Sequence, residues 1–231
     1  ELGGKDPGYV MEDADLDAAV ATLVDGAMFN SGQCCCGIER IYVHESLFEA
    51  FVDKAVAIVE GYKLGNPLAA DTDIGPMANI RFAREVRAQI DEALAAGATA
   101  HIARKAEDDG GAYLTPQILT RVTHEMRVMR DESFGPVVGI MPVADDEEAI
   151  RLMNDSRFGL TASLWTADIE RAQRVGDGVE TGTVFMNRAD YLDPGLCWTG
   201  CKDTGRGGGL SVIGYHNLTR PKSYYLKKTK T

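Results

Sequence analysis

Residues 136–143, PVVGIMPV, form an unbroken apolar run between polar segments. A run of this length is typical of a strand whose two faces are both buried. Such strands occur in parallel sheets, where helices cover both sides. The next segment supports this interpretation, because Asp145 can cap a helix whose Ala149 and Met153 face inward.

Helical and strand-like patterns alternate along the rest of the chain. Further strands are expected at 40–43, 98–103, 159–166 and 182–187, and further helices at 15–30, 46–59, 77–97 and after Thr166. Ser46 with Glu49 forms a capping-box pattern, and Thr166 is a second candidate N-cap. The alternation predicts an α/β fold with three layers, a parallel sheet covered by helices on both faces.

Charge and cysteine content exclude several classes of protein. The 231 residues carry a formal net charge of −11, which argues against nucleic acid and anionic membranes as partners. The sequence has no apolar run long enough for a transmembrane helix and no signal-peptide pattern. Five cysteines, mostly adjacent, do not indicate a secreted disulfide scaffold, so a cytoplasmic protein is expected. Without a starting Met, the chain is expected to begin inside a larger protein.

Three cysteines stand in a row in NSGQCCCGIERIYV, residues 30–43. Adjacent cysteines rarely reach disulfide geometry, and tetrahedral metal sites usually space their ligands by two or more residues. We therefore expect no metal site. Two interpretations stay open, a run of buried inert thiols and a reactive nucleophile.

The backbone around the triplet favours Cys35 as the reactive thiol. In an extended segment Cys35 would point away from Cys34 and Cys36, which makes it the singleton. Residues 30–33 break the preceding helix, and the amides that such a turn exposes can stabilise an oxyanion on a carbon bonded to sulfur.

Three motifs in order resemble the aldehyde dehydrogenase superfamily. FNSGQCCCGIERIYV resembles the segment of its nucleophile, ELGGKDP at residues 1–7 resembles its general-base motif, and ESFGPVV at 132–138 resembles a third motif. Glu1 lies 34 residues before Cys35, which is the family spacing. Weaker matches at 64–77, 154–166 and 182–187 extend the resemblance over essentially the whole chain.

The resemblance implies an NAD(P)-dependent oxidation of an aldehyde to a carboxylic acid. Cys35 would attack the aldehyde to give a thiohemiacetal, and hydride transfer to NAD or NADP would leave a thioester. Glu1 would activate the water that hydrolyses this thioester. Glu132 and Phe134 would contact the nicotinamide ribose.

The resemblance also places the substrate pocket. Its walls would be formed by Phe29, Cys34, Cys36, Leu192 and Trp198. These mostly apolar side chains favour an apolar or aromatic aldehyde, whereas Arg188 in the same loop could bind a carboxylated one. CWTG at 197–200 departs from the Pro-Phe-Gly-Gly of the family, so the substrate stays open.

The resemblance divides the chain into two parts. Residues 1–215 would form the catalytic domain, and residues 216–231 an exposed strand that pairs with another chain in a homodimer or homotetramer. The N-terminal half of the family, with the Rossmann region and an oxyanion-hole asparagine, is missing. We therefore expect no NADH production by these 231 residues alone.

Two other functions remain open from the sequence. A CoA-acylating dehydrogenase or another thioester transferase would use the same thiol, although Glu1 favours water as the acceptor. A non-catalytic interaction module would use the thiols only for packing.

Overall fold

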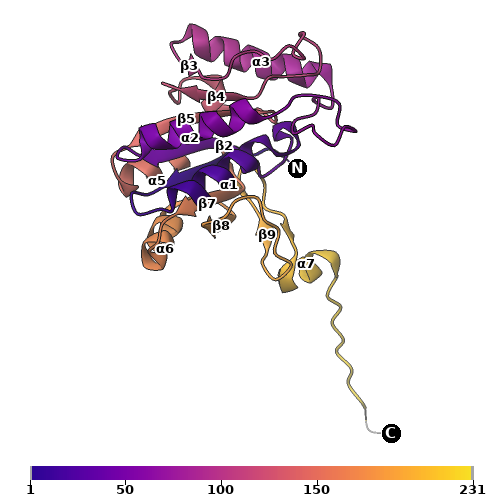
Figure 1. The fold of residues 1–231 in the computed structure, drawn as a ribbon. Helices are drawn as coiled ribbons and strands as arrows, with labels where there is room; N and C mark the ends of the chain where they lie inside the picture. The colour runs from indigo at the N-terminus through magenta and orange to yellow at the C-terminus, as the bar shows by residue number, and fades with distance from the viewer. Residues whose placement is uncertain (1, 230–231) are drawn as a thin grey trace.

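The computed structural model describes residues 2–229, which form one seven-stranded sheet between layers of helices (Figure 1). The strands are β1 Asp6–Val10, β2 Ile38–His44, β3 Thr99–Ala100, β4 Gln117–Thr120, β5 Val137–Val143, β7 Thr161–Trp165 and β8 Thr183–Met186. They lie in the order β3-β4-β5-β2-β1-β7-β8, and only β3 and β4 pair antiparallel. The predicted α/β fold with a mainly parallel sheet is confirmed.

Helices cover both faces of the sheet. They are α1 Leu16–Met28, α2 Phe48–Gly61, α3 Ile80–Ala95, α4 Arg127–Arg130, α5 Asp146–Asn154 and α6 Ile169–Gly178, whereas α7 Ser211–Leu218 packs against the short strand β11 Gly208–Gly209 outside this sheet (Figure 1). Successive strand residues face opposite sides, as Ile41 and Tyr42 in β2 do. Ile41 lies in the apolar cluster that contains Phe51 of α2, and Tyr42 in the cluster that contains Val86 of α3 and Val175 of α6. The predicted three layers are therefore present.

Two predicted helix boundaries are confirmed. Asp145 caps α5 by accepting the backbone N–H of Glu148 at 2.9 Å. Gly97 follows the end of α3 with a φ of 102°, which glycine adopts without steric cost. Local sequence chemistry is sufficient at both positions because each boundary depends on one residue.

Two predicted N-caps are wrong. Ser46 does not cap α2, because its Oγ lies 2.7 Å from Nδ1 of His44 instead. Asp168 caps α6 in place of Thr166. The Thr166 hydroxyl donates to Asp13 at 2.7 Å, a partner more than 150 residues away that no local pattern reveals.

The strand predicted at 98–103 is shortened to β3, Thr99–Ala100. Beyond it, the side chain of Gln117 replaces strand pairing. Its Oε1 accepts the backbone N–H of Ile102 at 3.3 Å, and its Nε2 donates to the Ile102 carbonyl at 2.6 Å. A side-chain amide thus satisfies backbone groups that a ladder would otherwise pair.

The C-terminal region differs from the predicted strand at 216–231. Residues 216–218 belong to the last turn of α7, so a strand cannot begin at 216. Residues 219–229 form no strand within the described chain and extend away from the body (Figure 1). Pairing of this tail with another chain stays a prediction, and residues 230–231 lie outside the described residues. In the described part, no helix has both the length and the apolarity to span a bilayer.

Two short antiparallel ribbons precede α7. β6 Phe158–Gly159 pairs with β10 Cys201–Lys202, and β9 Trp198–Thr199 pairs with β11 Gly208–Gly209. They place the CWTG segment next to the entry of β7, at the same edge of the sheet as the cysteines.

Candidate active site

The amino ends of β1, β2 and β5 form one edge of the sheet. Residues 2–5 lead into β1, residues 33–37 into β2 and residues 132–136 into β5. Because these strands are neighbours and parallel, the three entering segments lie side by side. The segments contain the three sequence motifs, so the sheet itself brings the motifs together.

The chain reverses sharply between α1 and the cysteines. Asn30 and Ser31 have φ values of 51° and 58°, in the left-handed region that is uncommon for L-residues. Gly32 follows with a φ of 70°, and a Cβ there would lie 2.2 Å from the carbonyl oxygen of Gly135. Glycine at this position lets the cysteine segment approach the segment that enters β5.

The three cysteines form a turn. The backbone N–H of Gly37 donates to the Cys34 carbonyl at 3.1 Å, and the three sulfur atoms lie within 4.8 Å of one another. The prediction that Cys35 points away from its neighbours is wrong, because side chains alternate only in extended backbone. Cys34 and Cys35 are half-buried and Cys36 is buried. The Cys35 thiol is therefore partly accessible.

Asp190, in the loop after β8, is the charged neighbour of the triplet. Its Oδ1 lies 2.7 Å from Sγ of Cys36, and its Oδ2 lies 3.4 Å from Sγ of Cys34. A hydrogen bond with Cys34, burial and the carboxylate raise the pKa of Cys36. The hydrogen bond with Cys36 lowers the pKa of Cys34.

The segment after Glu1 lies directly against the cysteine turn. A Cβ on Gly4 would meet the carbonyl oxygen of Cys35 at 2.8 Å, so the two backbones are in contact. The Thr204 hydroxyl donates to the Gly3 carbonyl at 2.8 Å and fixes this segment from the other side. Glu1, the predicted general base, lies outside the described residues.

The predicted cofactor residues lie on the loop that enters β5. Oε1 of Glu132 accepts the backbone N–H of Gly4 at 2.9 Å. The backbone N–H groups of Ser133 and Phe134 both donate to the carboxylate of Glu39 at 2.8 Å. These bonds hold the loop beside β1 and β2, and Glu132 and Phe134 are both half-buried there.

A buried ion pair contacts the loop that enters β5. Nζ of Lys5 contacts Oε2 of Glu39, and it also donates to Oγ of Ser133 at 3.1 Å. The Ser133 hydroxyl donates onward to Oε1 of Gln89 at 2.7 Å. Burial lowers the pKa of Lys5, and the Glu39 carboxylate opposes that shift. The network therefore fixes the loop from three elements, β1, β2 and α3.

Glu132 and Phe134 fit a ribose in their chemistry. A carboxylate accepts hydrogen bonds from vicinal hydroxyls, and an aromatic ring packs against the apolar face of a sugar. Both side chains belong to one short loop. Gly4 donates its backbone N–H to Glu132 of this loop and also lies against the Cys35 backbone. A nicotinamide ribose held by these two residues would be next to the thiol.

The predicted pocket walls are only partly assembled. Trp198 lines a cavity of about 470 Å³ together with Leu2, Leu160 and Arg206. Phe29 and Leu192 are 59% and 56% exposed and do not line this cavity. Cys34 and Cys36 flank Cys35 in the turn, as predicted from their positions.

Arg188, the candidate carboxylate binder in the sequence, stacks on a neighbour. Its guanidinium carbon lies 3.6 Å from the centre of the Tyr191 ring. Arg206 is the cation that lines the Trp198 cavity. A carboxylated ligand in that cavity would therefore meet Arg206.

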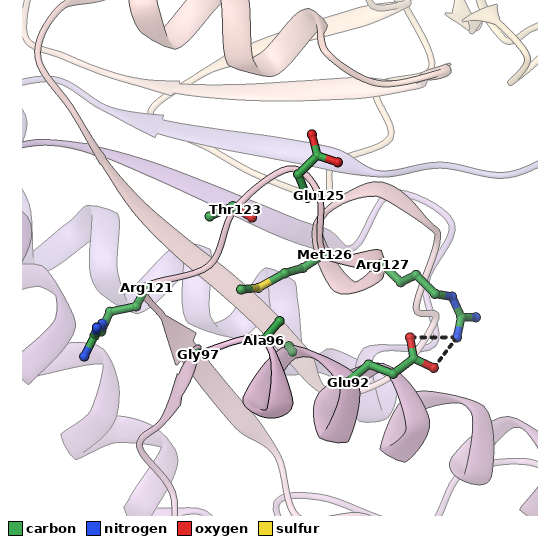
Figure 2. A pocket seen from close by; sticks show the side chains of 9 residues that line it. Glu92, Ala96, Gly97, Arg121, Thr123, Glu125, Met126 and Arg127 are labelled. Carbon is green, nitrogen blue, oxygen red and sulfur yellow. Dashed lines mark hydrogen bonds and ion pairs between the residues drawn. The ribbon is translucent and has the colours of Figure 1, made fainter.

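A second cavity, of about 500 Å³, lies at the end of α3 (Figure 2). None of the predicted site residues lines it. Arg127 at its rim is paired with Glu92 at 3.0 Å and also with Glu85. None of the sequence motifs contributes a residue to this cavity, so it gives no indication of catalysis.

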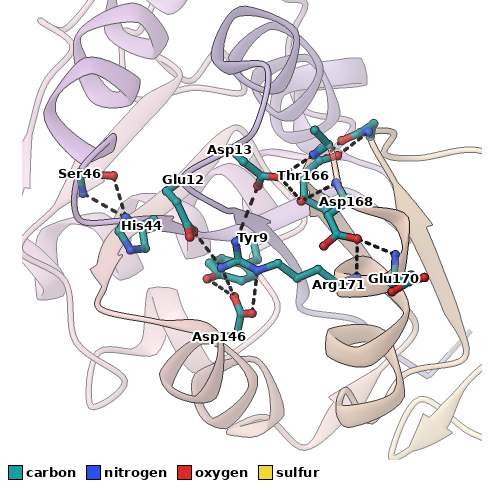
Figure 3. A network of polar contacts seen from close by, with 12 residues as sticks. Tyr9, Glu12, Asp13, His44, Ser46, Asp146, Thr166, Asp168, Glu170 and Arg171 are labelled. Atoms are coloured by element: carbon teal, nitrogen blue, oxygen red, sulfur yellow. Dashed lines mark hydrogen bonds and ion pairs between the residues drawn. The ribbon is translucent and has the colours of Figure 1, made fainter.

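The carboxyl ends of the same strands hold an ionic network (Figure 3). Arg171 of α6 donates two hydrogen bonds of 2.8 Å to Asp146 and one of 2.8 Å to Glu12. The Tyr9 hydroxyl also donates to Asp146, at 2.8 Å. These hydrogen bonds raise the pKa of Arg171. The network joins α5 and α6 to β1 and has a structural role.

Sequence reasoning missed three contributors to the site. Asp190 lies 154 residues from Cys36, Glu39 acts through backbone amides of another loop, and Arg206 lies within a glycine-rich stretch. The sequence contains a signal only for Glu39. Lys5 and Asp6 follow Gly-Gly in the first motif, and a charged pair that enters a strand needs buried partners.

Comparison with known proteins gives a consistent result. A sequence profile described as the Aldehyde dehydrogenase family matches residues 1–224. A curated "Succinate-semialdehyde dehydrogenase [NADP(+)]" from Mycolicibacterium paratuberculosis is 38% identical over 231 residues, which are 100% of this chain and 49% of that protein. A protein of that name from Mycobacterium leprae is 37% identical over 98% of this chain and 50% of its own length. The chain spans about half the length of these curated relatives.

Solved structures agree with this result. Lactaldehyde dehydrogenase from Escherichia coli superposes with a TM-score of 0.93 at 34% identity, covering 99% of this chain and 48% of that chain. Betaine aldehyde dehydrogenase from Staphylococcus aureus in complex with NAD+ superposes with a TM-score of 0.89 at 35% identity, covering 94% and 44%.

Proposed function

The chain belongs to the aldehyde dehydrogenase family, and we propose that it is the thiol-bearing part of an enzyme that oxidises an aldehyde to a carboxylic acid with NAD or NADP. One observation carries the proposal. The partly accessible Cys35 turn, the Gly3–Gly4 segment and the Glu132 loop meet at one edge of the sheet. The chemistry needs these three parts within reach of a single carbonyl carbon.

Cys35 is the proposed nucleophile. Its sulfur, as thiolate, attacks the aldehyde carbon, and the former carbonyl oxygen becomes the oxyanion of a thiohemiacetal. The half-buried state of Cys35 supports this role, because a residue sealed in the core could not meet a substrate. Cys34 and Cys36 confine the reacting carbon on either side.

Glu132 and Phe134 are the proposed cofactor contacts. Glu132 accepts a ribose hydroxyl and Phe134 packs on the same sugar, which orients the nicotinamide toward Cys35. When bound, NAD or NADP accepts the hydride that the former aldehyde carbon loses. The acyl group then remains on the Cys35 sulfur as a thioester.

Glu1 is the proposed base for the last step. It takes a proton from water, whose oxygen attacks the thioester carbon, and the carbon–sulfur bond breaks to release the acid and the thiolate. The position of Gly4 against the Cys35 backbone supports this assignment, since Gly4 lies three residues after Glu1 in the chain.

Arg206 favours a carboxylated aldehyde as the substrate. It lines the Trp198 cavity, and the two curated relatives named above are succinate-semialdehyde dehydrogenases. An apolar aldehyde, expected from the pocket walls alone, is the competing assignment. In the full-length protein, Arg206→Gln should raise the KM for succinic semialdehyde at least tenfold and leave that for butanal within twofold. Arg188→Gln is the matched control, and equal effects on both aldehydes would refute a carboxylate contact.

The decisive test of the function uses Cys35→Ala in the full-length protein. Aldehyde-dependent NADH or NADPH formation should fall by about 10³-fold or more, because the covalent route is lost. Cys201→Ala serves as the matched thiol control and should keep activity. Acid-quenched mass spectrometry should find the acyl adduct on Cys35 of the unmodified enzyme. Undiminished turnover by Cys35→Ala would refute the proposal, and acyl-CoA formation on adding CoA would reassign the acceptor.

Two further parts of the proposal concern the whole protein. The 231 residues alone should form no NADH, because the cofactor contacts proposed here reach only one ribose. Residues 219–229, with exposed Tyr224, Tyr225 and Leu226, are proposed to pair with another subunit in a homodimer or homotetramer. The cytoplasmic location stays a prediction.

A further inference from the structure

The cysteine turn has the dimensions of a metal-thiolate site. The Cys34 and Cys36 sulfurs are 3.8 Å apart, and all three sulfurs lie within 4.8 Å of one another. In a tetrahedral zinc site with Zn–S bonds of about 2.3 Å, neighbouring sulfurs are about 3.8 Å apart. One pair already has this spacing, and the Cys35 sulfur needs a shift of no more than about 1 Å.

Asp190 lies beside two of the three sulfurs, but it is not part of the group of mutually close donors that the cysteines form. Its two carboxylate oxygens contact the sulfurs of Cys36 and Cys34, at 2.7 and 3.4 Å. The carboxylate belongs to a distant loop, so it approaches the sulfurs from outside their own turn. Three sulfurs match the preference of Zn²⁺ and Cd²⁺, whereas Mg²⁺ and Ca²⁺ prefer oxygen alone.

The expected absence of a metal at this position rests on a ligand spacing of two or more residues. The turn from Cys34 to Gly37 removes that requirement, because it folds adjacent side chains to one side. The two remaining cysteines, Cys197 and Cys201, are not part of this group.

We propose that Cys34, Cys35 and Cys36 bind one soft divalent cation, Zn²⁺ or Cd²⁺, through three thiolates, with the negative charge of Asp190 beside the site. Each bound ion displaces the thiol protons into solvent, up to three of them. The Cys35 sulfur coordinates the bound ion, so this sulfur cannot attack an aldehyde. Binding stands independently of the enzyme activity, and only this inhibition rests on the proposed function.

The test is a titration of the full-length protein with Cd²⁺, in a non-thiol reductant that keeps the cysteines reduced without chelating the metal. The ultraviolet thiolate-to-cadmium charge-transfer band should saturate at one ion per chain. Zn²⁺ should compete for the same site, and proton release should accompany binding. Mg²⁺ should give no competition at millimolar concentration.

Variants assign the ligands. Cys34→Ser and Cys36→Ser should each weaken Cd²⁺ binding at least tenfold, and Asp190→Asn should weaken it without removing the charge-transfer band. Cys201→Ser is the matched control and should bind as the unmodified protein does. Circular dichroism checks that each variant is folded. No saturable band at one equivalent, or an unchanged band in the Cys34→Ser/Cys36→Ser double variant, would overturn the site.

Activity measurements distinguish a failure of the metal site from a failure of the proposed function. Stoichiometric Cd²⁺ should abolish aldehyde oxidation, and a chelator should restore it fully. Saturated binding with undiminished turnover would overturn the inhibition and the nucleophilic role of Cys35, while the metal site would stand. Loss of turnover in Cys35→Ala, together with no saturable Cd²⁺ binding by the unmodified protein, would overturn the metal site alone.

Discussion

Gly4 donates its backbone N–H to Oε1 of Glu132 at 2.9 Å, while its α-carbon faces the carbonyl oxygen of Cys35. A single residue without a side chain thus joins the three segments that enter β1, β2 and β5. The distance between nucleophile and cofactor loop depends on this contact, and a side chain at position 4 would change it.

Gly4→Ala should impair the enzyme more than the fold. The added Cβ would lie 2.8 Å from the Cys35 carbonyl, so the turn must shift. We expect kcat/KM of the full-length protein to fall by about 10²-fold, and stability by about 1–3 kcal/mol. Steady-state kinetics and urea unfolding measure the two effects. Gly61→Ala, where a Cβ meets nothing within 4 Å, is the control and should leave both nearly unchanged. Normal activity in Gly4→Ala would contradict the close approach.

Lys5→Met should be among the most destabilising substitutions. It leaves the Glu39 carboxylate buried without its cation, which costs about 3–5 kcal/mol. Lys54→Met removes an exposed ion pair with Asp17 and should cost less than about 1 kcal/mol. Urea unfolding compares the two. Adding Glu39→Gln to Lys5→Met should recover part of the loss, and equal effects of the two lysine variants would show that burial does not matter here.

Asp6 should make stability depend on pH. Burial raises its pKa to about 8, and its Oδ2 accepts the Thr161 hydroxyl at 2.7 Å. Below about pH 4 the carboxyl is protonated in both the folded and the unfolded state. Between about pH 4 and 8 only the unfolded state ionises readily, so the free energy of unfolding falls as pH rises.

Asp6→Asn should flatten that pH dependence. Urea unfolding at several pH values from 5 to 8 would measure the slope, with the exposed Asp17→Asn as control. The control should keep the slope of the unmodified protein. A slope in Asp6→Asn equal to that of the control would mean that Asp6 is ionised in the folded protein.

Asp190→Asn should make Cys34 and Cys36 more reactive. The hydrogen bond between the two thiols and burial have the largest effects on their pKa values. The Asp190 carboxylate has a smaller effect and raises both. Its removal should speed alkylation by iodoacetamide roughly threefold to tenfold at pH 8. Peptide mapping resolves each cysteine. Asp193→Asn in the same loop is the matched control, and unchanged labelling in both variants would exclude an electrostatic role for Asp190.

The sequence was informative where one residue or one period decides the structure. The apolar run at 136–143 became β5, Asp145 capped α5, and Gly97 ended α3. The meeting of the three motifs was also predictable in principle, because each precedes a strand and the strands are parallel neighbours.

Contacts between distant residues were not predictable. The cysteine triplet was interpreted as extended, but the turn that Gly37 closes gathers its sulfurs. Asp190 reaches the triplet only because the loop after β8 folds back over it. Asp13 accepts the Thr166 hydroxyl, which therefore does not cap α6. Each of these outcomes depends on tertiary neighbours that no local window contains.

The seven residues of β2 separate the thiol turn from the opposite rim of the sheet, by about 23 Å at roughly 3.3 Å per residue. A fluorophore attached at the exposed Glu45, just beyond that strand, would sit far from every reacting atom. Such a probe could report unfolding or subunit exchange during turnover, with the chemistry itself left untouched.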